Sequence, residues 1–355
     1  MIRPDFTSPR VRGEVDRESG RVRGIIRDFE CFRPASHSDP LPVRTGRGSS
    51  LSWPLRLGLA HVVGAILGLA SLTGAAPAKA ESMRVIVYDH DVRIEVIAEG
   101  DGPLVVMLPS RGRGAEDFDA VAGDLAKAGF RVLRPEPRGA ALSRGPMQNL
   151  TLHDLANDVA AVIRIAGGGG SAIIVGHAFG SWVARMVAVD HPELVRGVVL
   201  VAAAAKAYPT GFPGAAELSE AVRKSGDFTL SAAERMKYLR LAFFAPNSDA
   251  TIWLHGWHPD ADEAQSAAGR ATGQSEWWSG GSVPLLDLQG ELDPFKPRAM
   301  SNEMRDEFGE RVSVVVIANA SHAVIPEQPA AVTTAILAWI NKLPSLESQG
   351  ALTAK

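Results

Sequence analysis

The chain of 355 residues contains a single cysteine, Cys31, which lies in its N-terminal part. The sequence therefore excludes an intramolecular disulfide and, beyond Cys31, a cysteine-based metal site or a cysteine nucleophile. The formal net charge is only −3, so the composition lacks the basic excess typical of broad nucleic-acid binding. The sequence also lacks a G-x-G-x-x-G motif opening a helix, a His-Glu-x-x-His motif, internal repeats and heptads. We expect no cofactor, no metal and no nucleic-acid partner.

The overall balance of residues is that of a globular protein, because 46% are hydrophobic and 22% are charged. The charge is unevenly distributed along the chain. Residues 1–80 carry more basic than acidic side chains, whereas residues 81–355 are acidic overall. The two parts therefore call for separate interpretations.

The first 80 residues show the features of a leader and a targeting segment. Residues 1–50 are rich in Arg, Pro, Ser and Gly without helical or strand periodicity, which predicts a disordered leader. A start codon assigned too far upstream would explain its length. Residues 51–80 contain Arg56, an apolar run over 57–76 and a final Ala-x-Ala, the pattern of a secretory signal peptide cleaved after Ala80. We expect export to the periplasm or medium without stable membrane association, or a membrane anchor if uncleaved.

Strand and helix signals alternate through most of the remaining chain, which predicts a doubly wound, mostly parallel α/β sheet. We expect this core over residues 81–205 and 283–345, beginning with a hairpin at 83–98. Within it the sequence predicts strands at 104–108 and 312–317 and helices at 115–128 and 297–308. Thr151 is predicted to be the N-cap of a helix over 150–166. Residues 206–282 interrupt the alternation with helical, Gly- and Ser-punctuated sequence that contains four tryptophans. An inserted helical block in such a sheet predicts a cap over the carboxyl ends of the strands, where ligands bind.

The sharpest motif is Gly-His-Ala-Phe-Gly at residues 176–180, between an apolar strand over 172–175 and a predicted helix over 179–189. This is the strand–turn–helix context of a nucleophile elbow, G-x-S-x-G. Glycines are needed because the sharp turn leaves no room for side chains beside it. The turn holds its central residue at a helix N-terminus, where main-chain N–H groups can stabilise an oxyanion. Here the central residue is Ala178, which carries no nucleophilic atom.

Two later motifs supply an acid and a base in the order expected for this kind of site. Asp293 lies in Gly-Glu-Leu-Asp-Pro after a predicted strand, where its carboxylate can orient a histidine. His322 lies in Ala-Ser-His-Ala after the last predicted strand, where it can act as the base. The elbow comes first, then the acid and then the histidine.

Together these motifs resemble the α/β-hydrolase superfamily, in its group of small esterase, epoxide-hydrolase and haloperoxidase relatives. The resemblance covers roughly residues 83–342. Leu-Pro-Ser-Arg-Gly at 108–112 stands where relatives carry His-Gly-x-Pro, and residues 136–143 resemble their Asp-x-Arg-Gly-x-Gly-x-Ser loop. The resemblance implies an α/β-hydrolase fold and an oxyanion hole formed by the main-chain N–H groups of Arg111 and Phe179.

The chain departs from the family pattern above all at Ala178, the position of the serine nucleophile. Loss of this serine costs about a millionfold in kcat, with roughly 10³–10⁴ over water remaining. Three interpretations stay open: a His-Asp dyad that works as a general base without a covalent intermediate, a catalytically silent binding protein, or an alanine engineered to trap a substrate. The first is our leading hypothesis, with a small, apolar, ester-like substrate or a related small molecule.

The remaining candidate residues surround the predicted pocket. Ser110 lies beside the oxyanion position and is the best alternative hydroxyl, whereas His177 is expected to pack beside the sheet. Trp253 and Trp257 of the predicted cap are expected to contribute to an apolar pocket or to cap packing. Arg113, like Arg111, adds charge at the pocket mouth or in a solvated loop. The sequence does not indicate an oligomeric state.

Overall fold

The computed structural model describes residues 82–207 and 214–344, so the predicted leader and signal peptide lie outside the described residues. Eight strands form one sheet in the order β1-β2-β4-β3-β5-β6-β7-β8. The strands are β1 (Met83–Asp89), β2 (Val92–Glu99), β3 (Leu104–Leu108), β4 (Arg131–Pro135), β5 (Ala172–His177), β6 (Val195–Val201), β7 (Leu285–Gly290) and β8 (Val312–Ile317). β2 pairs antiparallel with β1 and with β4, and all other neighbours are parallel. The sequence-based prediction of a doubly wound, mostly parallel sheet is confirmed.

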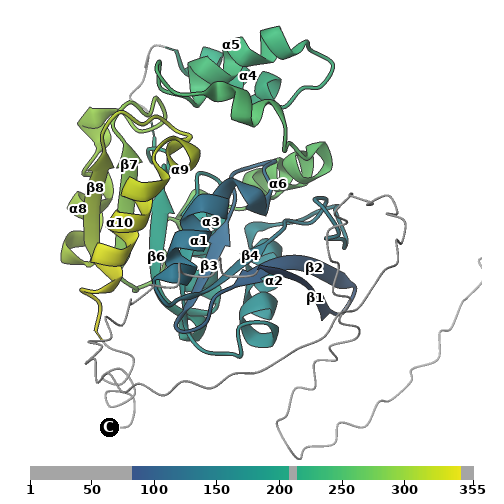
Figure 1. Cartoon of the computed structure of the whole chain (residues 1–355), viewed down its shortest axis with the longest axis vertical. Helices are drawn as coiled ribbons and strands as arrows, with labels where there is room; N and C mark the ends of the chain where they lie inside the picture. Colours follow the sequence, from purple (N-terminus) through teal and green to yellow (C-terminus); the bar gives the residue numbers. More distant parts are fainter. Residues whose placement is uncertain (1–81, 208–213, 345–355) are drawn as a thin grey trace, which may run out of the picture.

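Helices cover both faces of the sheet (Figure 1). One core cluster packs α1 and α10 against the strands, and a second core cluster on the other face contains α2 and α3. The α-helices are α1 (Asp119–Lys127), α2 (Leu152–Ile165), α3 (Gly180–Asp190), α4 (Ala215–Ser225), α5 (Ala232–Ala242), α6 (Pro259–Ala271), α7 (Gln274–Trp277), α8 (Glu303–Phe308), α9 (Val324–Glu327) and α10 (Pro329–Ile340). Short 3₁₀ turns are η1 (Ala115–Phe118), η2 (Pro192–Leu194), η3 (Ala250–Leu254), η4 (Arg298–Met300) and η5 (Gly309–Arg311).

Local sequence explains the strands and helices that position the site. All five residues of β3 are buried, as expected for a strand covered on both faces. α2 begins after Thr151, whose hydroxyl accepts from the N–H of Asp154 while the Asp154 carboxylate accepts from the N–H of Thr151. The helix predicted to start at Ala115 is divided, because its first turn is the 3₁₀ turn η1 and α1 follows directly.

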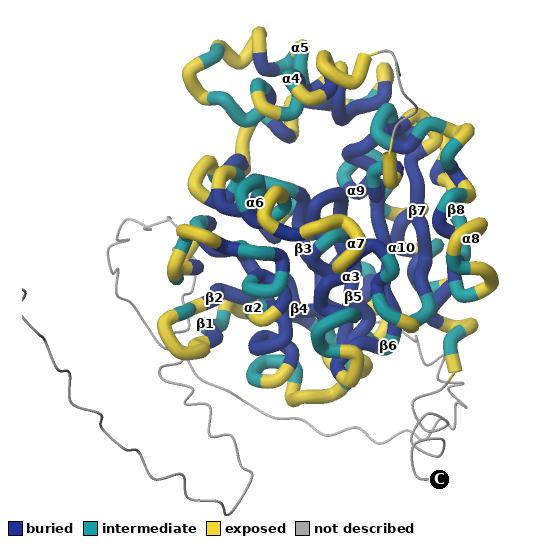
Figure 2. The backbone as a smooth tube through the Cα atoms, turned by 180° about the vertical axis from the view of Figure 1, so that it is seen from behind, coloured by how far each residue is buried: buried dark blue, intermediate teal, exposed yellow. Residues whose placement is uncertain are grey.

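Between β6 and β7, the described residues 214–282 form α4, α5, η3, α6 and α7 and contain no strand. We call residues 214–282 the insertion. In Figure 1, α4 and α5 lie furthest from the sheet and α6 lies between them and the core. In Figure 2, the strands run through the buried centre, whereas much of α4 and α5 is exposed. Among the described residues, no helix is both long and apolar enough to cross a membrane.

Candidate active site

The turn between β5 and α3 has the geometry of a strained elbow. Ala178 has a φ of +48°, in the left-handed region that costs a residue with a side chain roughly 1–2 kcal/mol. A Cβ on Gly176 would lie 2.3 Å from the carbonyl oxygen of Gly180, and one on Gly180 would lie 2.3 Å from that of Leu108. The two glycines are therefore required by close approaches of the main chain. The elbow keeps its conformation although its central side chain is only a methyl group.

His322 and Asp293 form a buried hydrogen-bonded pair. Nδ1 of His322 lies 2.9 Å from Oδ2 and 3.1 Å from Oδ1 of Asp293. The same carboxylate accepts from the main-chain N–H of Phe295 at 2.8 Å, which fixes its orientation in the turn after β7. A carboxylate at Nδ1 favours the tautomer with the proton on that nitrogen, which leaves Nε2 free to accept a proton. The structure thus brings the predicted acid and base together.

His177 ties the loop of His322 to the end of β5. It is fully buried, and its Nε2 lies 2.8 Å from the main-chain oxygen of His322. Because a carbonyl oxygen only accepts, Nε2 of His177 carries the proton and donates. Burial, with a smaller contribution from the charge of His322, lowers the pKa of His177 to about 3. His177 is therefore a neutral hydrogen-bond donor that positions the histidine loop, rather than a second base.

Aromatic rings surround the imidazole of His322. The ring of Phe295 lies 4.4 Å from it between centroids, and that of Phe243 lies 5.7 Å away. Trp253 contacts His177 at 6.0 Å and Trp257 at 5.9 Å. Phe243 and the two tryptophans belong to the insertion, so the insertion supplies much of the apolar packing around His322 and Asp293. Such packing excludes water and strengthens the hydrogen bond between His322 and Asp293.

The two main-chain N–H groups expected to form the oxyanion hole come from separate segments. Phe179 precedes α3, so its N–H belongs to the helix N-terminus, where no intrahelical acceptor exists. Arg111 lies in the turn after β3, beside the buried Ser110. The Nε of Arg111 donates to Asp262 of α6 at 2.7 Å, so this side chain is tied to the insertion.

Arg113, two residues further on, is a residue whose role the sequence did not indicate. Its side chain is 3% exposed, and its guanidinium donates to both carboxylate oxygens of Asp117, at 2.9 and 2.6 Å. It also donates to the main-chain oxygen of His255 at 2.6 Å and lies 4.6 and 4.9 Å from the rings of Trp253 and Trp257. Both expectations for Arg113, a charge at the pocket mouth and a place in a solvated loop, are therefore wrong, because its side chain is buried between the core and the insertion.

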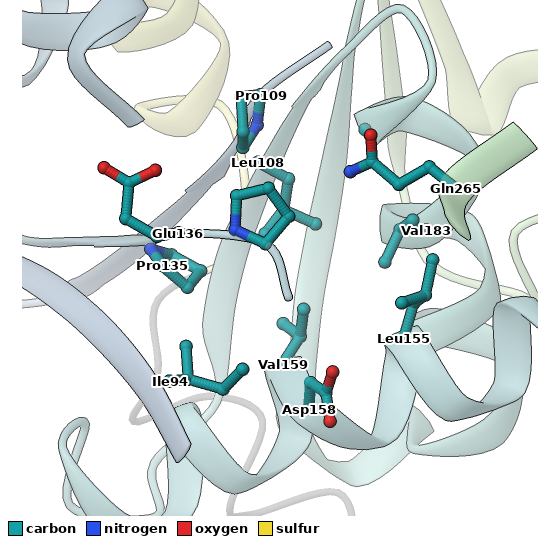
Figure 3. Close-up of a pocket in the computed structure, with 12 residues that line it drawn as sticks. Ile94, Leu108, Pro109, Pro135, Glu136, Leu155, Asp158, Val159, Val183 and Gln265 are labelled. Atoms are coloured by element: carbon teal, nitrogen blue, oxygen red, sulfur yellow. The ribbon is translucent and has the colours of Figure 1, made fainter. Parts of the chain in front are cut away.

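Two cavities are described in the vicinity. The smaller cavity, of about 50 Å³, lies beside the carboxyl end of β3. Apolar side chains line it together with the polar groups of Glu136, Asp158 and Gln265 (Figure 3). Burial raises the pKa of Glu136 and of Asp158. The larger, of about 490 Å³, lies between α4 and α6 and contacts Arg111 and Phe295.

The four predicted pocket residues line neither cavity. Ser110 is 5%, His177 0%, Trp253 1% and Trp257 8% exposed. The two tryptophans belong to one buried cluster with Phe243 and Phe244. Among the described residues, no group of three or more His, Cys, Asp or Glu side chains could hold a metal ion.

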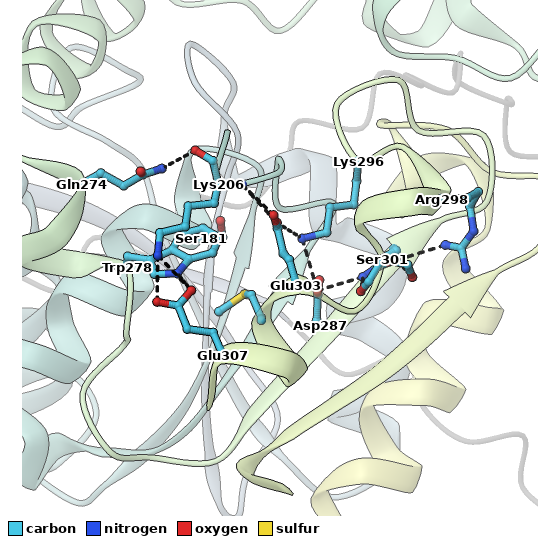
Figure 4. A network of polar contacts seen from close by, with 12 residues as sticks. Ser181, Lys206, Gln274, Trp278, Asp287, Lys296, Arg298, Ser301, Glu303 and Glu307 are labelled. Atoms are coloured by element: carbon cyan, nitrogen blue, oxygen red, sulfur yellow. Dashed lines mark hydrogen bonds and ion pairs between the residues drawn. The ribbon is translucent and has the colours of Figure 1, made fainter. Parts of the chain in front are cut away.

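A polar network around Lys296 and Glu303, drawn in Figure 4, adjoins the turn that carries Asp293. Lys296 is fully buried, and its Nζ lies 2.5 Å from Glu303 and 3.5 Å from Asp287. Its main-chain N–H donates to the oxygen of Asp293 at 3.2 Å. Burial raises the pKa of Asp287. The only hint in the sequence was an aspartate inside the apolar β7 run, and that hint did not identify its partners.

Known proteins share the fold of this chain. Residues 103–329 match the sequence profile described as the alpha/beta hydrolase fold. A curated 2-(acetamidomethylene)succinate hydrolase from Mesorhizobium japonicum is 30% identical over 110 residues, which cover 31% of this chain but only 39% of that protein.

Solved structures agree in fold. The crystal structure of E-2-(acetamidomethylene)succinate hydrolase has a TM-score of 0.60 at 23% identity and covers 74% of this chain and 100% of that one. An esterase from Thermogutta terrifontis, determined with malate bound, also has a TM-score of 0.60, at 21% identity over 75% of this chain and 100% of that one. At these identities the structures show a common fold and nothing finer. The chain belongs to the alpha/beta hydrolase fold family.

Proposed function

We propose that this protein is an enzyme in which His322 and Asp293 act as a general-base pair on a small, ester-like substrate. The observation that carries the proposal is the intact hydrogen bond of 2.9 Å between them, beside an elbow that keeps a φ of +48° at Ala178. Strained main-chain conformations of this kind cluster at functional sites. No acyl-enzyme can form at residue 178, so the base must act on water or on the substrate itself.

The simplest reaction is direct hydrolysis. Nε2 of His322 accepts a proton from water as the water oxygen attacks the acyl carbon. The carbonyl oxygen becomes an oxyanion, which the N–H groups of Arg111 and Phe179 would stabilise. The bond to the leaving oxygen then breaks, and the leaving group takes the proton back from His322. Asp293 stabilises the positive imidazole between the two transfers.

The names of the relatives support hydrolysis as the reaction class. One is a hydrolase of 2-(acetamidomethylene)succinate, and another is an esterase. Because the alignment covers only 39% of the curated relative, its substrate is not carried over. The aromatic rings of Phe243 and Phe295 at His322 favour an apolar group at the reacting end of the substrate.

The test compares hydrolysis of 4-nitrophenyl acetate and butyrate by four forms of the full chain. These are the natural sequence, His322→Ala, Ala178→Ser, and His153→Ala as a control. His153 is a histidine on α2 that is 42% exposed and pairs with Asp190 at 2.8 Å. We expect His322→Ala to lower the natural rate by about 10²–10⁴, the usual contribution of a general base, and His153→Ala to leave it unchanged.

Equal rates for the natural chain and His322→Ala would contradict the proposal. Activity only with Ala178→Ser would instead favour the second candidate function, a catalytically silent binding protein with intact hydrolase machinery. The observation that favours this alternative is the methyl group of Ala178 at the nucleophile position. Under it, the natural chain would bind a ligand without turnover.

A further inference from the structure

The cavity between α4 and α6 is large enough for a small organic molecule. Its volume of about 490 Å³ falls within the roughly 300–1,000 Å³ common for ligand pockets. Separate parts of the chain contribute to its wall, namely α4, α6, the turn after β3 and the turn after β7. In Figure 1, α4 and α6 face one another above the sheet. The cavity therefore exists only in the folded chain, where these distant segments come together.

The charges lining this cavity are unbalanced. Three arginines, Arg111, Arg223 and Arg270, face two carboxylates, Asp262 and Glu263. Asp262 is already paired with Arg111 at 2.7 Å. Within the described ranges, neither Arg223 nor Arg270 forms an ion pair, and Arg270 donates only to the hydroxyl of Ser266. The lining therefore leaves one positive charge in excess, with two guanidinium groups available.

The positions of these two arginines favour a carboxylate over a phosphate. Arg223 lies in the last turn of α4 and Arg270 in the last turn of α6. The C-terminal ends of helices carry partial negative charge, which disfavours a dianion placed beside them. The carboxylates of Asp262 and Glu263 act in the same direction. A single carboxylate matches the excess charge and the planar, bidentate geometry of a guanidinium.

The opposite side of the cavity leads to the candidate active site. Phe295 lines the cavity and also contacts His322, with ring centroids 4.4 Å apart. Val222 adds apolar surface from α4. The cavity thus combines a positive side with an apolar side next to the base.

We propose that this cavity binds a small molecule bearing one carboxylate, held by Arg223 and Arg270, with its uncharged end against Phe295. The inference rests on the proposed function only for the role of the neighbouring His322. It names the class of molecule that the site accepts, a monocarboxylate with an apolar or acyl group at its other end.

Binding can be measured without turnover. Isothermal titration calorimetry on the full chain would compare hexanoate with hexanamide, which has the same shape without the charge. We expect hexanoate to bind at least about tenfold more tightly, since a hydrogen bond to a charged group contributes more than a neutral one. The affinity for hexanoate should fall as the salt concentration rises, whereas that for hexanamide should not change.

Variants assign the effect to the two arginines. Arg223→Gln and Arg270→Gln should each weaken hexanoate binding about tenfold and leave hexanamide binding unchanged. Arg240→Gln is the matched control, because Arg240 is an exposed arginine of α5 that does not line the cavity. Arg223 and Arg270 are also exposed, so circular dichroism should show unaltered folding in all three variants.

Several results would overturn the inference. They are no binding of hexanoate, equal binding of hexanamide, unchanged affinity in both arginine variants, or tighter binding of methyl phosphate than of hexanoate. The His322→Ala variant separates this inference from the proposed function, since it should bind hexanoate normally. Carboxylate binding without His322-dependent turnover would refute only the proposed function. Such turnover without carboxylate binding would refute only the inference.

Discussion

The structure predicts opposite effects of a glycine-to-alanine change at Gly176 in the elbow and at Gly123 in α1. Gly176 lies near the end of β5, and a Cβ there would meet the carbonyl oxygen of Gly180 at 2.3 Å and the N of Ser181 at 2.6 Å. Ordinary van der Waals contact requires 3.4 Å or more, so a Gly176→Ala variant must move main chain by about 1 Å. Gly123 lies inside α1, and a Cβ added to it would have no atom within 4 Å. A methyl group there meets open space.

The expected free energies of unfolding follow from these distances. The atoms near Gly176 are main chain and cannot rotate away, so overpacking should cost about 3 kcal/mol, the upper end of its usual range. Gly123→Ala should instead stabilise the protein by about 0.5–1 kcal/mol, because alanine restricts the unfolded chain and favours a helix. The two variants should therefore differ by about 4 kcal/mol, close to a thousandfold in the folding equilibrium.

Urea denaturation followed by circular dichroism at neutral pH measures this difference, with the slope compared between variants. Each variant changes the same residue type in the same way, so only the surroundings differ. A Gly176→Ala variant within 1 kcal/mol of the natural protein would refute the reasoning about the elbow. So would a Gly123→Ala variant that is the less stable of the two.

Three further outcomes test individual contacts. The pKa of His177 is about 3 in the folded chain and 6.5 in the unfolded chain. The contribution of His177 to the free energy of unfolding should therefore be fully present above pH 6.5 and fall by up to about 1.4 kcal/mol per pH unit towards pH 3. In His177→Gln, unfolding should take up one proton fewer between pH 3 and 6.5, so the free energy of unfolding should depend less on pH. Denaturation at a series of pH values measures this, and the same pH dependence in both proteins would contradict it. Arg113→Met should destabilise by about 3–5 kcal/mol by leaving Asp117 unpaired, and the added change Asp117→Leu should recover part of this in urea denaturation. Ala178→Gly should raise Tm, gaining about 1 kcal/mol through relief of the positive φ, and a lower Tm would argue against strain.

Many strands and helices of the core could be predicted from the local pattern of apolar and capping residues. The apolar run over 104–108 became β3, and residues 312–317 became β8 with the predicted bounds. Thr151 was identified as an N-cap, and its side chain accepts the expected hydrogen bond. These features depend on neighbours in the chain, through strand burial and capping, so they are visible without the fold. The boundaries of α1 and α8 were less accurate because a 3₁₀ turn precedes each helix.

Part of the candidate site could be predicted, because the residue types in its motifs indicate an acid and a base. Asp293 and His322 were selected by their place after predicted strands, and they lie within hydrogen-bond distance. The sharp turn predicted from the two glycines of the elbow is present, with a φ of +48° at Ala178. By contrast, the sequence left open whether Trp253 and Trp257 line a pocket or pack within the cap, and in the structure both are buried around Arg113.

The sequence by itself determined the fold class, the order of elbow, acid and base, and the absence of a nucleophile at residue 178. Only the tertiary structure decided which charges are buried and where a ligand can fit. Arg113 meets His255 across 142 positions, and Arg111 meets Asp262 across 151. Lys296 is enclosed by carboxylates from a strand and a helix. No local pattern encodes such contacts, because they arise when a parallel sheet brings the ends of distant strands to one edge.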